Sequence, residues 1–174
     1  MSFSVRPATP NDVAQMHSMI IELAEFEKAV DEVIATKEQL ERALFGGTTF
    51  SQLPANTPNG SPAIFAHVID DPDIPGQLAG MAIWFLNYST WQGEHGIYLE
   101  DLYVRPKYRG QGLGKALLKQ LAKICTERGY TRFQWWVLTW NQTAIDVYKG
   151  IGAVPMDEWV VYRLTGDKLT EFAN

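Results

Sequence analysis

The stretch EDLYVRPKYRGQGLGKALLKQLA, residues 100–122, places three glycines at alternate positions where a helix must begin. It starts as an apolar, aromatic strand, passes through a basic turn and ends with leucines at helical spacing. Glycine lets the backbone adopt positive φ and lets a ligand approach the main chain closely. The first amides of a helix have no partner within it, and the helix dipole adds positive charge there. The strand, glycine turn and helix start together therefore predict an anion site, best suited to phosphate.

Two familiar phosphate signatures do not fit this turn. A Walker loop that ends at Gly114-Lys115 needs glycine where Arg109 stands and a metal-binding hydroxyl where Ala116 stands. A dinucleotide fingerprint that begins at Gly110 needs glycine where Lys115 stands. Arg109 and Lys115 instead flank the turn with positive charge. On the turn alone, a tight structural turn without a ligand remains an alternative.

The rest of the chain predicts a single α/β domain over residues 1–174, because strands and helices follow one another without a linker or an internal repeat. Hydrophobic alternation and turn residues predict strands at 3–6, 63–69, 78–88, 96–104, 133–138 and 159–164. Apolar spacing and capping residues predict helices that begin near 9–12, 36–39, 112 and 141. The strand at 133–138 has bulky side chains on both faces, which predicts a central strand covered on both sides. Residues 51–60 are predicted to form a loop.

Composition narrows the class of protein. The chain has 174 residues and a net charge of −5, so no large cationic field exists to attract nucleic acid. Its single cysteine, Cys125, lies in an apolar helical pattern and is predicted to be a core residue, and its three histidines show no ligand spacing for zinc. The N-terminus shows no signal peptide and no run of 18 apolar residues occurs, so we expect no membrane span and a cytoplasmic setting.

The pattern Arg-x-x-Gly-x-Gly after a strand resembles the pyrophosphate loop of the GNAT acetyltransferase superfamily, which binds acetyl-coenzyme A. The resemblance covers nearly the whole chain, because further short sequences occur in the order found in diamine (spermidine/spermine) acetyltransferases and their thialysine-acetylating relatives. They are VRPAT near the start, ELAEFE at 22–27, YLEDLYV at 98–104, YRGQGLG at 108–114, WN at 140–141 and YKGIGA at 148–153. Each is weakly specific and their ordered sum is strongly so. The resemblance implies a GNAT fold, in which a central mixed, mostly antiparallel sheet is flanked by helices.

The resemblance also implies the catalytic groups. Acetyl transfer from a thioester to an amine needs a neutral amine, a polarised carbonyl and a protonated leaving thiol. Tyr148 is implied as the general acid beside the sulfur; by its residue type alone, an aromatic anchor of the last helix is the more typical role. Glu100 is implied to bind the amine and to accept its proton; the alternative is a charged residue at a strand end. No metal is implied.

The implied ligand contacts fall into two sets. Coenzyme contacts are expected from the main chain of the strand, from the glycine turn and from the start of the last helix: Leu102, Tyr103, Val104, Arg109, Gly110, Gln111, Gly112, Leu113, Gly114, Lys115, Asn141 and Ala144. Contacts with the amine are expected from Phe26, Glu27, Glu100, Gln134, Trp135 and Trp136. Taken by itself, the acidic segment around Glu27 is more typical of a solvated helix face. Phe26 replaces the tyrosine usual in the family, and Trp135 and Trp136 are bulkier than the usual residues.

The sequence is thus interpreted as a GNAT acetyltransferase that acetylates a primary amine of a small cationic metabolite. Polyamines are the first choice of substrate, and thialysine or another lysine-like amine is the second. One alternative is a protein lysine or N-terminal acetyltransferase, and another is a coenzyme-binding module without catalysis. Relatives of this type are usually homodimers, so a homodimer is expected. No nucleic-acid or membrane partner is expected.

Overall fold

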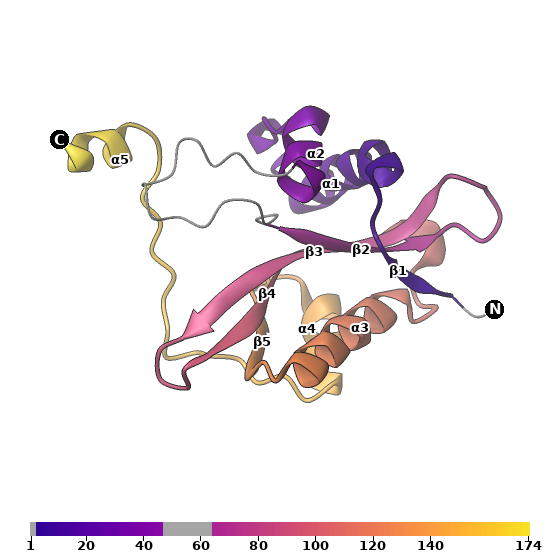
Figure 1. Ribbon diagram of the computed structural model, residues 1–174. Coiled ribbons are helices and arrows are strands. Elements are labelled where there is room, and N and C mark those ends of the chain that lie inside the picture. The colour runs from indigo at the N-terminus through magenta and orange to yellow at the C-terminus, as the bar shows by residue number, and fades with distance from the viewer. Residues whose placement is uncertain (1–2, 47–63) are drawn as a thin grey trace. The chain divides into compact units, whose positions relative to one another are not determined.

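The computed structural model describes residues 3–46 and 64–174. The chain divides into two compact units, Met1–Trp136 and Val137–Asn174. The first unit holds a five-stranded sheet in the order β1-β2-β3-β4-β5 (Figure 1). The strands are β1 (Val5–Pro7), β2 (Phe65–Asp70), β3 (Leu78–Ser89), β4 (Glu94–Val104) and β5 (Arg132–Trp135). The first four strands pair antiparallel, and β5 runs parallel to β4. The predicted α/β class with a mixed, mostly antiparallel sheet is confirmed.

The helices of the first unit lie on both faces of this sheet (Figure 1). They are α1 (Val13–Glu27), α2 (Lys37–Phe45) and α3 (Leu113–Arg128), with short 3-10 turns at Pro10–Asp12, Val30–Glu32 and Pro106–Tyr108. The second unit holds α4 (Gln142–Gly150) and α5 (Gly166–Ala173). In the described residues, no helix combines the length and the apolar character that a membrane crossing requires.

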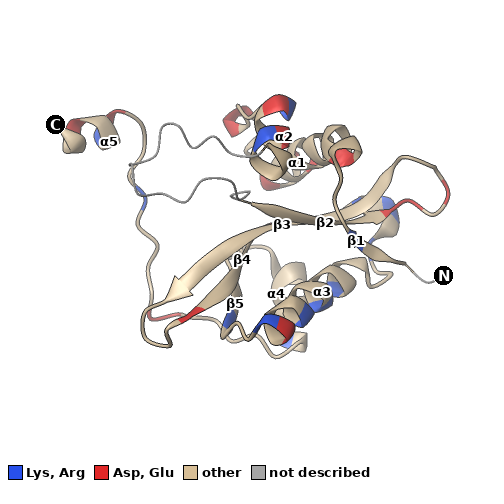
Figure 2. Cartoon of the chain, in the orientation of Figure 1, with Lys and Arg blue, Asp and Glu red and all other residues tan. Residues whose placement is uncertain are grey.

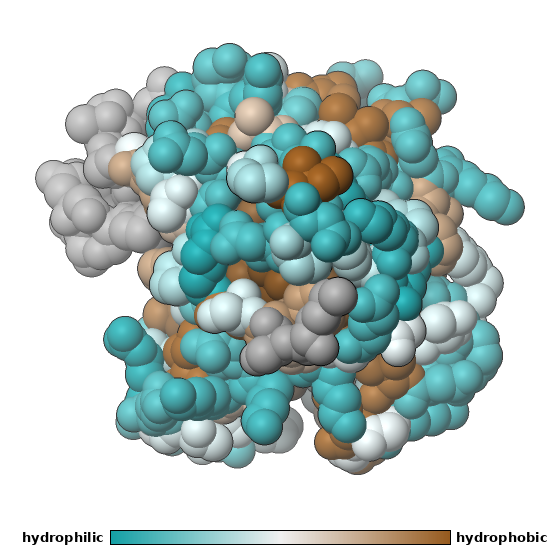
Figure 3. Space-filling model, turned by 90° about the vertical axis from the view of Figure 1, so that its right-hand side faces the viewer, coloured by the Kyte–Doolittle hydropathy of each residue, from teal (hydrophilic) through white to brown (hydrophobic). Residues whose placement is uncertain are grey.

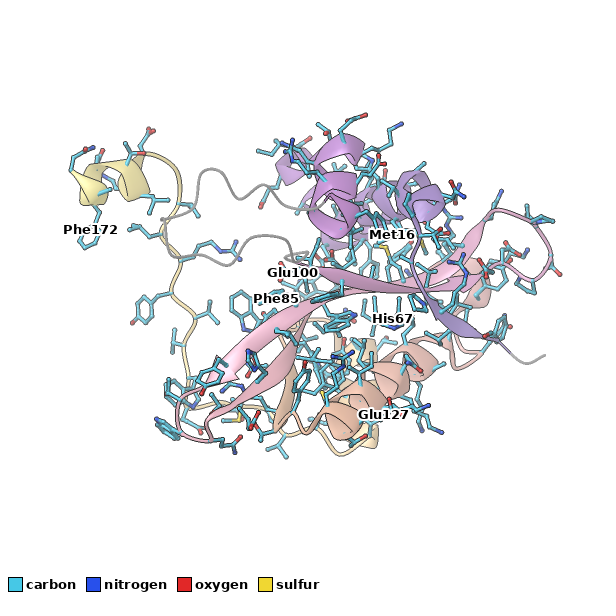
Figure 4. All side chains as sticks on the ribbon, viewed as in Figure 1. Met16, His67, Phe85, Glu100, Glu127 and Phe172 are labelled. Carbon is cyan, nitrogen blue, oxygen red and sulfur yellow. The ribbon has the colours of Figure 1, made fainter. Side chains whose placement is uncertain are left out.

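The core on the α1 and α2 side is apolar and closely packed. Met16 and Met19 of α1 are fully buried there against Val68 of β2 and Met81 of β3. Figure 4 shows Met16 between α1 and the sheet, and His67 on the opposite side of the sheet. His67 accepts a hydrogen bond at Nδ1 from Nε1 of Trp84 (3.1 Å), so this buried ring is satisfied within the core. Burial of these apolar side chains fixes α1 against the sheet.

On the other face, α3 presents a leucine stripe to β3, β4 and β5. Leu113, Leu117 and Leu121 are almost completely buried at helical spacing. Cys125 is also buried and free, as the sequence predicted. Gly129 ends the helix with a φ of 70°. This packing holds the first turn of α3, and with it the glycine turn, at a fixed place beside the end of β4.

Capping residues set the other helix boundaries as predicted. Thr36 accepts from the backbone N–H of Gln39 at 3.2 Å, and the Gln39 side chain accepts from the Thr36 backbone at 2.8 Å. This capping box begins α2, and Gly46 follows its last residue. The predicted loop at 51–60 and the predicted strand residue Ala63 lie outside the described residues.

Two predictions for the C-terminal part are wrong. The strand at 133–138 is shorter, ends at Trp135, and lies at an edge of the described sheet instead of at its centre. No strand forms at 159–164, where the backbone is irregular and the side chains are exposed. A strand needs a neighbour to satisfy its backbone hydrogen bonds, and the second unit, taken by itself, provides no sheet edge. The prediction of one domain over residues 1–174 stays a prediction.

Charge is unevenly distributed on the first unit. Basic residues lie along α3, and acidic ones are frequent in α1 and the turn after it (Figure 2). The face seen in Figure 3 is mostly hydrophilic, with hydrophobic residues in separate patches.

Candidate active site

The glycine turn has the geometry that an anion site requires. Gly110 and Gly112 have φ of 74° and 86°, in the left-handed region that side chains disfavour. Gly112 is the N-cap of α3, and its carbonyl accepts the first helical hydrogen bond from Ala116 at 2.9 Å. The amides at 113–115 therefore lie in the first turn, where no acceptor exists within the helix. A Cβ at Gly114 would meet only Val104 Cγ2, at 3.8 Å.

The residues of this turn that the sequence singled out lie together. Gly110, Gln111 and Gly112 form the exposed turn, and Lys115 is exposed in the first turn of α3. Leu113 differs from them, because its side chain is buried and anchors the helix in the core. Arg109 also differs. Its side chain turns back from the glycines, as its Nε donates to the carbonyl of Val104 at 2.9 Å.

β4 offers main-chain groups beside this turn. Pairing between β4 and β5 ends at Leu99 and Trp135, so within the described sheet residues 100–104 have no partner on the β5 side. Ile83 of β3 pairs with Asp101 while the next residue, Trp84, pairs with Leu99. Glu100 is therefore the extra residue of a β-bulge, a feature that bends a strand and re-aims its side chains. The predicted contacts Leu102, Tyr103 and Val104 lie on this open stretch.

Three carboxylates gather where β4 meets the end of α1. Glu100 is exposed at the bulge. Asp101 is largely buried, and burial together with the charges of Glu100 and Glu27 raises its pKa to about 6. Burial also raises the pKa of Glu27, the last residue of α1. The arrangement favours cations, because each added positive charge relieves repulsion among the carboxylates.

Asp101 is the residue that sequence reasoning missed. Glu100 and Asp101 are adjacent and both acidic, so the sequence does not show which of the two is buried. Ile83 belongs to the core on the α1 side, and its pairing with Asp101 places that carboxylate on the same side. The burial of Asp101 can be recognised only when the position of the bulge and the face of the sheet that α1 covers are both known.

The last two turns of α1 are tied to β4 and to the residues that follow it. Glu22 accepts from Arg105 at two points, Nη2 to Oε1 at 3.0 Å and Nε to Oε2 at 3.3 Å. The ring of Phe26 lies under the Arg109 guanidinium, with its centroid 5.2 Å away. The predicted amine contacts Phe26 and Glu27 thus lie beside the predicted coenzyme strand and turn.

The structure separates the predicted amine contacts Gln134 and Trp135 of β5 and Trp136, the residue after that strand. Tyr98 pairs with Gln134 and its ring meets that of Trp136 edge-on, with centroids 5.7 Å apart. Tyr98 also stacks on Phe85 at 4.9 Å, so an aromatic cluster stands on the same face as Asp101. Trp135 alternates to the other face, beside Phe133. The geometry therefore groups Gln134 and Trp136 with the acidic site and places Trp135 apart from it.

The remaining predicted residues belong to the second unit. Asn141 caps α4, because its Oδ1 accepts from the backbone N–H of Ala144 at 3.2 Å. Tyr148 lies on the second turn of α4, and burial raises the pKa of its phenol. A raised pKa keeps the phenol protonated over a wider pH range. Among residues 3–46 and 64–174, no three His, Cys, Asp or Glu side chains are placed so that they could hold a metal ion together.

Comparison with known proteins identifies the family. The sequence profile of the acetyltransferase (GNAT) family matches residues 28–153. The chain belongs to the GNAT acetyltransferase family. It is 34% identical over 174 residues to the thialysine N-epsilon-acetyltransferase of Bos taurus, which covers 97% of this chain and 96% of that protein. It is 34% identical over 194 residues to the L-ornithine N5-acetyltransferase of Arabidopsis thaliana, which covers 95% of this chain and 85% of that protein.

The GNAT fold is also shared with solved structures. An integron cassette protein from the V. cholerae mobile metagenome matches with a TM-score of 0.73 and 22% identity, which covers 99% of this chain and 98% of that chain. The resemblance predicted from the sequence is confirmed. GNAT acetyltransferases use acetyl-coenzyme A, which fits a glycine turn that presents helix amides beside an open strand edge.

Proposed function

We propose that the protein transfers the acetyl group of acetyl-coenzyme A to a primary amine of a small cationic metabolite. The observation that carries the proposal is the adjacency of two sites in the first unit. One is the glycine turn with the open edge of β4. The other is the cluster of three carboxylates from Glu27, Glu100 and Asp101, which the end of α1 and the bulge bring to that same strand.

The glycine turn and β4 are proposed to hold the coenzyme. The amides at 113–115 and the positive end of α3 would bind the pyrophosphate, and Lys115 would add charge. Main-chain groups of residues 102–104 would pair with the pantetheine arm as an added strand does, and one amide there would polarise the acetyl carbonyl. Acetyl-coenzyme A supplies the activated acyl group as a thioester.

The carboxylates are proposed to bind the amine and to take its proton. A lysine-like amine has a pKa of about 10.4, so about one molecule in a few thousand is neutral at pH 7. Asp101, with a pKa of about 6, is a better matched proton acceptor near neutral pH than an ordinary carboxylate. Glu100, which is exposed, is proposed as a second acceptor of the amine proton, either directly or through water. Glu27 and the aromatic cluster of Phe85, Tyr98 and Trp136 would hold a second positive charge.

Tyr148 is proposed to protonate the departing thiolate. Its phenol is a weak acid that is protonated at neutral pH, and burial raises its pKa further. The names of the two relatives favour the terminal amines of thialysine and ornithine as substrates, and polyamines share the same terminal amine. A homodimer and a cytoplasmic setting complete the proposal, with no nucleic-acid or membrane partner.

Thiol release tests the proposal. Purified protein with acetyl-coenzyme A is given thialysine, ornithine, lysine, putrescine, spermidine and a lysine-containing peptide in separate reactions. We expect amine-dependent release with at least one of the small cations and a much slower release with the peptide. Release with the peptide alone would favour a protein acetyltransferase. Coenzyme binding without release for any amine would favour a binding module.

A further inference from the structure

Arg109 precedes the glycine turn, yet its side chain contacts the end of α1 and the end of β4. Its Nε donates to the Val104 carbonyl at 2.9 Å. Its guanidinium lies 5.2 Å from the ring centroid of Phe26 and 5.6 Å from that of Tyr103. Both distances fall within the range of cation–π attraction. Arg109 therefore connects the turn to the last turn of α1 and to the end of β4 at once.

A second link ties the same face of α1 to the same loop. Glu22 lies four residues before Phe26, which places both on one side of the helix. Glu22 forms the two hydrogen bonds from Arg105, whose Nη1 also donates to the carbonyl of Leu78 in β3 at 3.1 Å. The Arg105 link is thus anchored to the sheet.

The two links differ in what they hold. Arg105 is held by the Leu78 carbonyl of β3 and Arg109 by the Val104 carbonyl of β4, but Arg109 also adjoins Gly110, so its link alone reaches the glycine turn. Glu27 is the residue after Phe26, and its charge contributes to the raised pKa of Asp101. A displacement of the turn would therefore reach Glu27 and Asp101 through Arg109 and Phe26.

We propose that Arg109 is a positioning residue that couples the binding of phosphate groups at the glycine turn to the placement of the acidic end of α1. The proposal rests on the proposed function, since it takes the turn as the coenzyme site and the α1 end as the amine site. Coenzyme binding fixes the turn, and the guanidinium then holds Phe26 and the end of α1 in one position. By linkage, loosening the α1 end weakens coenzyme binding by the same factor. The size of a partly exposed cation–π contact sets that factor at about two- to fivefold.

Hydrogen exchange of the whole protein with coenzyme A as the probe tests this coupling. We expect saturating coenzyme A to slow amide exchange both at residues 110–116 and at residues 22–30 of the wild-type protein. In Arg109→Met, which keeps the length of the side chain without its charge, and in Phe26→Leu, the slowing at 22–30 is lost. In Phe26→Leu the affinity for coenzyme A falls only about two- to fivefold. Arg128→Met, at the exposed far end of α3, is the matched control and should behave as wild type.

Each outcome bears on a separate statement. If wild type binds coenzyme A without protection at 22–30, or if Phe26→Leu keeps that protection, the coupling is refuted and the proposed function stands. If Arg109→Met loses binding more than about a hundredfold while Phe26→Leu retains full protection, Arg109 is a direct phosphate ligand. If wild type binds no coenzyme A, the proposed function itself fails.

Discussion

Replacing Asp101 with asparagine should stabilise the fold in a pH-dependent manner. A carboxyl group whose pKa is raised by folding binds its proton more tightly in the folded protein than in the unfolded chain. Below about pH 4 both states are protonated and Asp101 costs no stability; above about pH 6 both are ionised and the full cost is present. The pKa of about 6, against the ordinary aspartate value of 3.8, corresponds to about 3 kcal/mol, at 1.36 kcal/mol for each pKa unit.

Urea denaturation of wild type and Asp101→Asn between pH 4 and pH 8 measures this cost. The two proteins should be almost equally stable at pH 4, and the variant should gain up to about 3 kcal/mol by pH 7.5, with the change between pH 4 and pH 6. Asp31→Asn, on an exposed turn, is the matched control and should shift stability by less than about 0.5 kcal/mol. A difference that does not vary with pH, or a variant less stable than wild type at pH 7.5, would refute the placement of Asp101 as a buried carboxylate among like charges.

Three further substitutions test other parts of the site. Tyr148→Phe should lower turnover by about 10²–10⁴-fold with little change in coenzyme affinity, because the proton is needed only as the thioester breaks. Steady-state kinetics would measure the turnover and calorimetry the affinity. Near wild-type turnover would show that Tyr148 has only a packing role. Glu27→Gln should raise the Michaelis constant about two- to fivefold for a substrate with two positive charges and less for a monoamine, and high salt should shrink the effect; equal effects on both would place Glu27 on a solvated face. Gly114→Ala should weaken coenzyme A binding about tenfold in calorimetry, because the added methyl group hinders close approach of the phosphate to the amides of the turn. The fold should tolerate this methyl group, because its nearest neighbour, Val104 Cγ2, lies 3.8 Å away. Unchanged affinity in the folded variant would exclude this amide from the phosphate site.

Most of the fold follows from local signals in the sequence. The leucines of α3, the capping box of α2 and the glycine at 129 each act within one helix, so their patterns predict the boundaries that the structure shows. The positive φ of Gly110 and Gly112 is predicted for the same reason, because the backbone conformation of a helix start depends on the residues at that start.

The features that the sequence did not reveal depend on partners far away in the chain. A strand forms at 159–164 only if a sheet edge accepts its hydrogen bonds, and side-chain preference for strands cannot supply that edge. The buried state of Asp101 depends on a bulge in β4 and on helix α1, about 75 residues earlier in the chain. The contact between the Arg109 side chain and Phe26 likewise depends on where α1 packs. The spacing of residue types along the sequence does not predict such long-range contacts.

The most direct test of the central claim follows the acetyl group itself. Isotope-labelled acetyl-coenzyme A is incubated with the protein and an equimolar mixture of thialysine, ornithine, spermidine and a lysine-containing peptide, and the products are resolved by mass spectrometry. The account predicts that the label appears on a terminal primary amine of a small cation, and that Tyr148→Phe and Asp101→Asn both lower its yield. Label on the peptide alone, or free labelled acetate without any acetylated amine, would contradict it.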